Sequence, residues 1–155
     1  MSSAPDARAF RHALGAFATG ITVVTTVDAA GEPVGFTANS FNSVSLDPPL
    51  VLFSLARSAS SWDAFGAAQV FAVNVLGAEH QELSQRFART GGPKFEGTAF
   101  AARATGAPVL ADALAFFDCR VRSRHDGGDH VIFVGEVAAF GRREGEPLLY
   151  FAGQY

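Results

Sequence analysis

Apolar runs separated by turn-forming residues recur along the chain, and in 116–124 apolar and polar residues alternate with the period of two that is typical of β-strands. β-branched and aromatic residues fill these runs, which we predict as strands: 20–27, 33–37, 43–46, 50–55, 70–76, 116–124, 130–140 and 147–151. Turn-forming residues at 28–31 and 126–129 join neighbouring runs as hairpins. Long crossovers for parallel strands are missing, so the pattern predicts a mainly β, antiparallel barrel with peripheral helices.

Other segments show helical spacing. A first helix is predicted with Ser3 as its N-cap and its end at Thr19, and its apolar residues follow every three or four positions: Phe10, Leu14 and Phe17. Shorter helices are predicted at 58–65, closed by Gly66, and at 79–89. The segment 95–108 has no period and is predicted to be a loop.

The run 116–124 predicts a strand with two different faces. One face is apolar and is expected to lie in the core: Phe117, Cys119 and Val121. The other face is charged: Asp118, Arg120, Arg122 and Arg124.

The composition bounds the class of protein. The chain has 155 residues, of which 48% are hydrophobic and 17% charged, so we treat residues 1–155 as a single folded domain with its own core. A net charge of −3 without a basic run excludes a nucleic-acid partner. One cysteine excludes an intrachain disulfide, and no run of 18 apolar residues or secretion signal is present. We therefore expect a cytoplasmic protein with no membrane partner.

Several common catalytic and cofactor motifs are absent from the sequence. It contains no glycine-rich nucleotide-binding fingerprint of either common type and no G-x-S-x-G nucleophile motif. It has no H-E-x-x-H, and its four histidines are too scattered to predict a metal site. We expect no metal.

Two segments rich in small polar residues are the main candidates for a site. Segment 35–43 offers short donors and acceptors that suit a flat heterocycle or a polyhydroxyl chain, although a turn that satisfies its own backbone explains it as well. Segment 54–62 follows a buried strand and opens a helix with several serines and Arg57. Such a segment suits phosphate binding, although a serine N-cap beside a solvated arginine is an equal alternative.

The blocks of sequence in and around these segments resemble one known family. They occur in order from about residue 8 to the end of the chain: GITVVTT, GFTANSFNSVSLDPPLVLFSL, ARSASSW, FAVNVL, QELSQRF, KFEG and GDHVIFVGEV. This order and content is similar to the short-chain flavin reductases, the reductase partners of two-component flavin-dependent monooxygenases. The resemblance implies a flavin-binding split β-barrel with short peripheral helices.

The resemblance also implies the cofactor-binding residues. A first group would contact the flavin ring edge and the ribityl chain: Thr37, Ala38, Asn39 and Ser40. A second group would surround the ribityl phosphate, with Arg57 as a charge partner: Ser54, Leu55, Ala56, Ser60 and Ser61. The pair Lys94 and Phe95 matches a basic-aromatic pair of the family, and Lys94 would contact the phosphate.

His130 is the one catalytic residue that the resemblance implies. In the family, the histidine of the G-D-H block lies beside the flavin face on which nicotinamide stacks, and Asp129 could orient it. Relatives carry a basic residue near the end of the chain, where this sequence has Ala152 and Gln154.

The expected activity is hydride transfer from NADH or NADPH to FMN or FAD, which supplies reduced flavin to a partner monooxygenase. The family is usually a homodimer with flavin near the subunit contact, and fifteen phenylalanines fit this weakly. Two alternatives stay open from the sequence: a flavin-binding carrier or sensor without turnover, and a ferric-chelate reductase with bound flavin.

Overall fold

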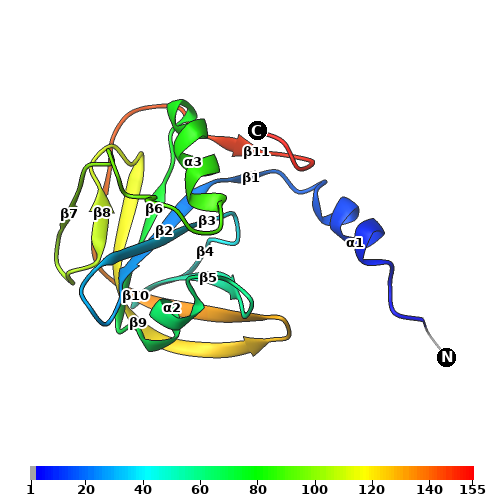
Figure 1. The fold of residues 1–155 in the computed structure, drawn as a ribbon, viewed down its shortest axis with the longest axis horizontal. Coiled ribbons are helices and arrows are strands. Elements are labelled where there is room, and N and C mark those ends of the chain that lie inside the picture. The colour runs from blue at the N-terminus through cyan, green and yellow to red at the C-terminus, as the bar shows by residue number, and fades with distance from the viewer. Residues whose placement is uncertain (1–2) are drawn as a thin grey trace.

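The computed structural model describes residues 3–155, and a seven-stranded antiparallel sheet forms its centre, in the order β3-β2-β6-β9-β10-β5-β4 (Figure 1). Its strands are β2 (Thr22–Val27), β3 (Pro33–Ala38), β4 (Asn42–Leu46), β5 (Pro49–Ala56), β6 (Val70–Val75), β9 (Ala115–Gly127) and β10 (His130–Arg142). Two-stranded sheets pair β1 (Thr19–Gly20) with β11 (Leu149–Tyr150), and β7 (Phe100–Ala102) with β8 (Pro108–Leu110). The mainly β, antiparallel architecture predicted from the sequence is confirmed.

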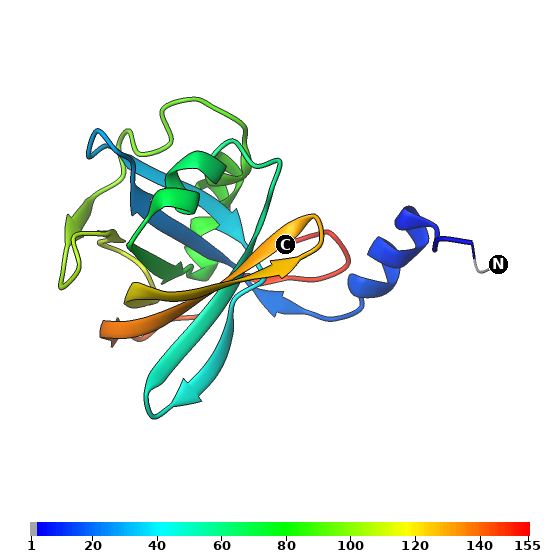
Figure 2. The same cartoon turned by 90° about the horizontal axis from the view of Figure 1, so that it is seen from below.

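Short helices lie outside the sheet. They are α1 (Ala7–Leu14), α2 (Trp62–Ala67), the 3₁₀ helix η1 (Ala78–His80) and α3 (Gln81–Ala88). Helix α3 packs against β3, whereas α1 stands clear of the body in both views, and the β4–β5 hairpin projects from the body in Figure 2. None of the helices in residues 3–155 is long and apolar enough to cross a membrane.

The sheet curls around one aromatic core. Alternate residues of six strands meet there, because every second side chain of a strand points to the same face. Phe53 of β5 and Phe133 of β10 stack with ring centroids 4.9 Å apart, and Phe65 of α2 closes the end of the cluster. Burial of each such side chain stabilises the fold by roughly 1.5–3 kcal/mol.

Gly135 is required by this packing. A Cβ atom at this position of β10 would lie 2.3 Å from Phe71 Cζ and 2.9 Å from Cys119 Cβ. The glycine therefore lets β6, β9 and β10 approach one another around the core, and the register of β10 against β9 shifts beside it, between Val134 and Gly135.

The structure corrects three expectations. The N-cap of α1 is Asp6 rather than Ser3, because the Asp6 carboxylate accepts a hydrogen bond from Arg8 N, and the helix ends at Leu14 rather than Thr19. The segment 95–108 is not a loop throughout, since it contributes β7 and the start of β8. Its strands are too short to show a period.

Asp118, on the charged face of β9, is fully buried. Its carboxylate accepts hydrogen bonds from Ala104 N at 2.7 Å, Thr105 N at 3.0 Å and the Thr105 hydroxyl. The alternation of charges predicted the face of the strand correctly, but it could not predict that the loop 103–106 would fold over this face.

Helix α2 also begins later than the sequence predicts, at Trp62, and it includes Gly66. Trp62 packs against the aromatic core, with its ring centroid 6.4 Å from that of Phe133. Ser61 precedes the helix as its N-cap residue, and its side chain makes no capping hydrogen bond.

Candidate functional site

A cleft of about 460 Å³ opens where the end of β3 faces the ends of β5 and β10. Most of its lining is small or polar: Phe36, Thr37, Ala38, Asn39, Ser40, Ser54, Leu55, Ala56, Ala59, Gly127, His130 and Ile132. The structure thus brings together eight residues that the sequence predicted for the site, from three separate segments: Thr37–Ser40, Ser54–Ala56 and His130. The volume lies within the range of about 300–1,000 Å³ that is usual for small-molecule sites.

Ser40 ties two of these segments together. Its hydroxyl accepts a hydrogen bond from Ser54 N at 2.9 Å and lies 3.2 Å from the Ser54 carbonyl oxygen, to which it donates. Beyond the end of β3, the Ser40 side chain thus makes the hydrogen bonds to the Ser54 backbone that a neighbouring strand would otherwise make. The contact holds the Thr37–Ser40 segment against β5 and so sets the width of the cleft.

Thr37 is fixed from the other side, by α3. Its hydroxyl donates a hydrogen bond to the carbonyl oxygen of Ser84 at 2.6 Å. Ser84 is fully buried, and its own hydroxyl lies 2.7 Å from the Tyr155 hydroxyl. The cleft wall is therefore braced by α3 and by the C-terminal residues, a connection that the sequence did not predict.

His130 stands at the start of β10 and faces the cleft. Its Nδ1 lies 2.7 Å from the Asp129 carboxylate, and about 45% of its side chain is exposed. The hydrogen bond from His130 lowers the pKa of Asp129, with the charge of the imidazole as a further cause. Asp129 therefore stays ionised near neutral pH and orients the ring, which leaves Nε2 free to act as a donor or an acceptor.

The remaining residues of the second predicted segment do not line the cleft. The Arg57 guanidinium donates to the Asp126 carboxylate at 2.7 Å and to the Gly128 carbonyl at 2.9 Å, so it clamps the β9–β10 turn. The hydrogen bond from Arg57 lowers the pKa of Asp126, and the hydrogen bond from Gly128 N and the charge of the arginine are further causes. Ser60 is exposed nearby, and Ser61 is buried under α2.

Lys94 and Phe95 also lie outside the lining. Lys94 Nζ lies 3.3 Å from the Phe87 carbonyl oxygen and 3.5 Å from that of Gly35, and burial lowers the pKa of this amine. Phe95 packs edge-on against Phe87, with ring centroids 4.9 Å apart. In this structure both residues attach the loop after α3 to the body.

The sequence missed four of the lining residues. Gly127 and Ile132 flank His130 on the β9–β10 hairpin, and Phe36 and Ala59 lie within the two polar segments but were not among the residues predicted to contact the ligand. The alternation of side chains along a strand could have indicated Ile132, because His130 and Ile132 are two residues apart and share a face of β10. No signal of this kind predicted Gly127, whose place depends on the pairing of the hairpin.

The lining fits the ring and ribityl parts of a flavin. Ala38, Ala56, Ala59 and Gly127 present little bulk, so a flat ring system can approach the backbone. The amide of Asn39 and the hydroxyl of Ser54 offer donors and acceptors for a polar ring edge or a polyhydroxyl chain. Within residues 3–155, no group of three or more His, Cys, Asp or Glu could hold a metal ion.

A curled antiparallel sheet with a cleft of hydroxyls, backbone groups and one imidazole at its strand ends defines a small-molecule-binding β protein. The family described as flavin reductase like domain matches residues 14–155, and the chain belongs to this family.

Individual relatives agree with this assignment. The FMN reductase (NADH) SmoA of Agrobacterium fabrum is 49% identical over 150 residues, which cover 97% of this chain and 85% of the relative. The reductase subunit HsaB of a flavin-dependent monooxygenase of Rhodococcus jostii is 44% identical, covering 99% of this chain and 79% of the relative. The chain spans only 48% of a probable flavin reductase of Rhizobium meliloti, at 46% identity.

Solved structures match the fold over nearly the whole chain. The NADH:FAD oxidoreductase SgcE6 of Streptomyces globisporus, in complex with NAD and FAD fragments, has a TM-score of 0.90 at 38% identity, covering 99% of this chain and 93% of that one. A putative oxidoreductase of Sinorhizobium meliloti has a TM-score of 0.95 at 45% identity, and the match covers 98% of this chain and 53% of that one.

Proposed function

We propose that this protein is an NADH:flavin oxidoreductase that transfers hydride from NADH to FMN or FAD and supplies reduced flavin to a partner monooxygenase. The observation that carries the proposal is the cleft itself, in which His130 and the small polar segments converge within a chain of the flavin reductase family. Relatives named as an NADH-dependent FMN reductase and as an NADH:FAD oxidoreductase support NADH as the donor.

The residues of the cleft bind and orient rather than react. When flavin is bound, its ring accepts the hydride, so the protein needs no nucleophile of its own. Thr37, Ala38, Asn39 and Ser40 hold the ring edge and the ribityl chain, and Ser54, Leu55 and Ala56 hold the chain toward its phosphate. Two hydrogen bonds, from Thr37 to the Ser84 carbonyl and from Ser54 N to the Ser40 hydroxyl, hold this wall in place when the nicotinamide ring enters.

His130 has a different task, which is to position the nicotinamide. Its ring is oriented by Asp129 and lines the cleft. Holding two rings at a near-attack distance of about 3–3.5 Å supplies most of what this reaction requires from a protein. We place the phosphate of the flavin near the remaining predicted residues: Arg57, Ser60, Ser61, Lys94 and Phe95.

The same proposal includes a homodimer, in the cytoplasm, that works with a separate flavin-dependent monooxygenase. The exposed aromatic residues support the dimer, since Phe10, Phe17, Phe140 and Phe151 are each more than half exposed in the single chain. The subunit name of the Rhodococcus relative supports the monooxygenase partner. The free thiol of Cys119 agrees with a reducing compartment.

The test is NADH oxidation by the purified protein, followed at 340 nm with FMN, FAD, riboflavin or ferric chelate added in turn. We expect consumption of NADH to rise with added FMN or FAD and to be weak with NADPH. A yellow protein that oxidises no NADH when flavin is added would instead be a carrier. Turnover that needs ferric chelate and no added flavin would identify a ferric-chelate reductase.

A further inference from the structure

A tight turn after β11 brings Tyr155 back toward α3. Phe151 N donates a hydrogen bond to the Gln154 carbonyl at 2.7 Å, and Gln154 N donates to the Phe151 carbonyl at 2.9 Å. Two left-handed residues reverse the chain between them, Ala152 with a φ of 53° and Gly153 with a φ of 76°. A non-glycine residue in this conformation is strained and persists where the surrounding structure fixes it. The position of Tyr155 is therefore held by the turn that precedes it.

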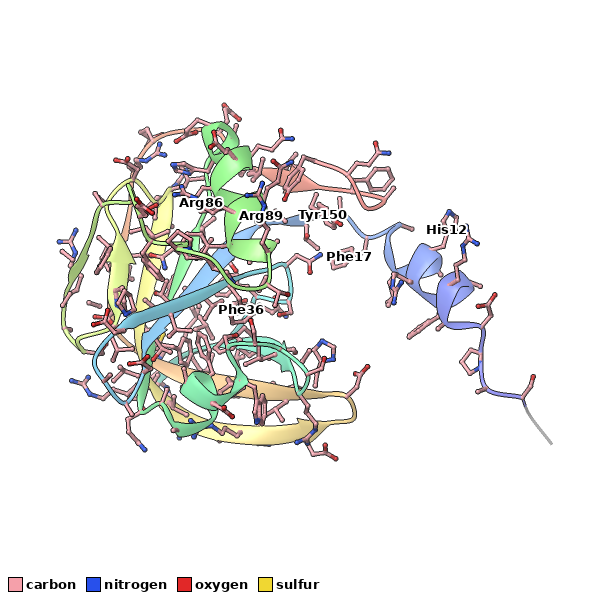
Figure 3. All side chains as sticks on the ribbon, in the orientation of Figure 1. His12, Phe17, Phe36, Arg86, Arg89 and Tyr150 are labelled. Atoms are coloured by element: carbon pink, nitrogen blue, oxygen red, sulfur yellow. The ribbon has the colours of Figure 1, made fainter. Side chains whose placement is uncertain are left out.

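Helix α3 is the neighbour of this tyrosine. The ring centroids of Tyr150 and Tyr155 lie 5.6 Å apart, and Tyr150 packs on the same core cluster as Phe87 of α3. Figure 3 shows Tyr150 beside this helix, which Arg86 marks. The Tyr155 hydroxyl lies 2.7 Å from the Ser84 hydroxyl, and in the part of the chain that the structure describes it is the only hydrogen-bond partner of that fully buried group.

Ser84 has two polar groups that serve different neighbours. Its hydroxyl pairs with Tyr155, whereas its backbone carbonyl accepts the hydrogen bond from the Thr37 hydroxyl at 2.6 Å. A carbonyl oxygen has two lone pairs, so it can accept from Thr37 and still take part in the helix. Thr37 lines the cleft, and its position therefore depends on where α3 places the Ser84 carbonyl.

A serine inside a helix has a competing partner on the helix itself. Its hydroxyl can donate to the carbonyl four residues earlier, which for Ser84 is that of His80, and such a bond often bends the helix. A buried hydroxyl without any partner costs free energy, so we expect Ser84 to make this bond whenever Tyr155 offers none. The resulting bend lies between His80 and Ser84, and it would move the Ser84 carbonyl relative to β3.

We propose that Tyr155 is a positioning residue for flavin binding. Its hydroxyl holds the Ser84 hydroxyl away from the carbonyls of α3, which keeps the Ser84 carbonyl in line with Thr37. This inference rests on the proposed function, because it takes Thr37 as a contact of the flavin. Tyr155 itself does not line the cleft, so its effect on the ligand passes through α3.

The first test removes only the hydroxyl of Tyr155. Tyr155→Phe keeps the ring beside Tyr150, and it should raise the Kd for FMN about three- to fivefold, measured by flavin fluorescence without NADH. In steady-state assays the KM for FMN should rise with it, whereas the KM for NADH should change less than about twofold. The matched control is Tyr150→Phe, which also loses only a hydroxyl and should alter neither constant.

The second test is a rescue by a further substitution. Ser84→Ala removes the hydroxyl that would bond back to α3, so the double variant Tyr155→Phe/Ser84→Ala should bind FMN within about twofold of the wild type. Ser84→Ala alone should do the same, because Tyr155 is 43% exposed and its hydroxyl can bond to water instead. Removing a further atom does not repair lost packing, so a rescue separates positioning from a purely structural role.

The outcomes are distinguishable. Unchanged FMN affinity in Tyr155→Phe, an equal loss in Tyr150→Phe, or an equal rise in the KM for NADH overturns the role of Tyr155. A double variant that binds FMN as weakly as Tyr155→Phe, or an equal loss in Ser84→Ala alone, overturns the mechanism through the Ser84 hydroxyl. A wild-type protein that binds no flavin would instead contradict the proposed function.

Discussion

The two faces of the β5–β10 ladder have different roles: one lies in the aromatic core and the other reaches the cleft. On one face Phe53 lies opposite Phe133, and both are fully buried in a stacked pair. On the other face, one residue further along, Ser54 lies opposite Ile132, and both line the cleft. The same strands therefore build the core with one set of alternate residues and the site with the other.

The aromatic core behind β5 and β10 therefore also holds the cleft rigid, and the cleft needs no separate hydrophobic core. A backbone held by aromatic packing on one side presents its other side at fixed positions, and preorganised groups are what a binding site needs. It follows that stability and ligand affinity should respond separately to substitutions at adjacent positions. The predictions below test this separation.

The largest effect is expected at Phe53. Phe53→Ala removes a side chain that packs against Phe133, Phe71 and Phe65, and it should lower the free energy of unfolding by about 3–5 kcal/mol in urea titrations. Leu52→Ala on the other face is the control and should cost less than half as much, since Leu52 is only half-buried. Equal losses would show that both faces are core.

At His130 the effect should fall on the nicotinamide. His130→Ala is expected to raise the KM for NADH about tenfold, while the Kd for flavin changes less than twofold and the unfolding midpoint stays within error. Asp129→Asn should give a smaller rise, because the ring remains but is less well oriented. If only flavin retention suffers, the assignment of His130 to nicotinamide is wrong.

The core face also predicts a dependence on alkaline pH through Cys119. Burial, with the charge of Asp118 as a second cause, raises the pKa of this thiol from 9.0 to about 12. The stability contributed by the neutral thiol is therefore complete below pH 9 and is lost as the pH rises toward 12. Between pH 8 and 10 the wild-type protein should lose about 1 kcal/mol more than Cys119→Ala, measured by urea unfolding at each pH.

Ser54→Ala should give the smallest effect, and only on ligand. It removes one hydroxyl of the cleft lining, so the Kd for flavin is expected to rise about three- to fivefold while the free energy of unfolding changes by less than about 0.5 kcal/mol. Ser58→Ala is the control and should alter neither, since Ser58 is exposed and lies two residues after the end of β5. A change in both variants would mean that the effect is not specific to the cleft.

Much of this protein followed from the sequence because strands and turns leave local signals. The turn at 126–129 and the alternation on either side predicted the β9–β10 hairpin, and the structure confirms it. The polar segments at 35–43 and 54–62 identified two walls of the cleft through their composition. The strands β7 and β8 were missed, because three residues are too few to show a period.

Other features depend on contacts between residues far apart in the chain. Asp118 is buried because loop 103–106 covers it, and Lys94 is held by two carbonyls that belong to different elements. Arg57 lies in a serine-rich segment that looks suited to phosphate, yet Asp126, in a turn 69 residues further along the chain, binds it. The register of the strands decides which residue a charged side chain meets. The sequence close to that charged residue does not indicate the register.

The sequence by itself determined which residues could form strands, where the hairpins turn and which short polar side chains were available to a ligand, because period and turn chemistry act over a few residues. Only the tertiary structure decided which of these side chains meet. It joined Ser40 to Ser54 and Thr37 to α3, and it left α1 without a buried residue. The physical reason is that a curled sheet brings residues together by strand order, and the strand order here, with β10 between β9 and β5, follows from the packing of the whole core.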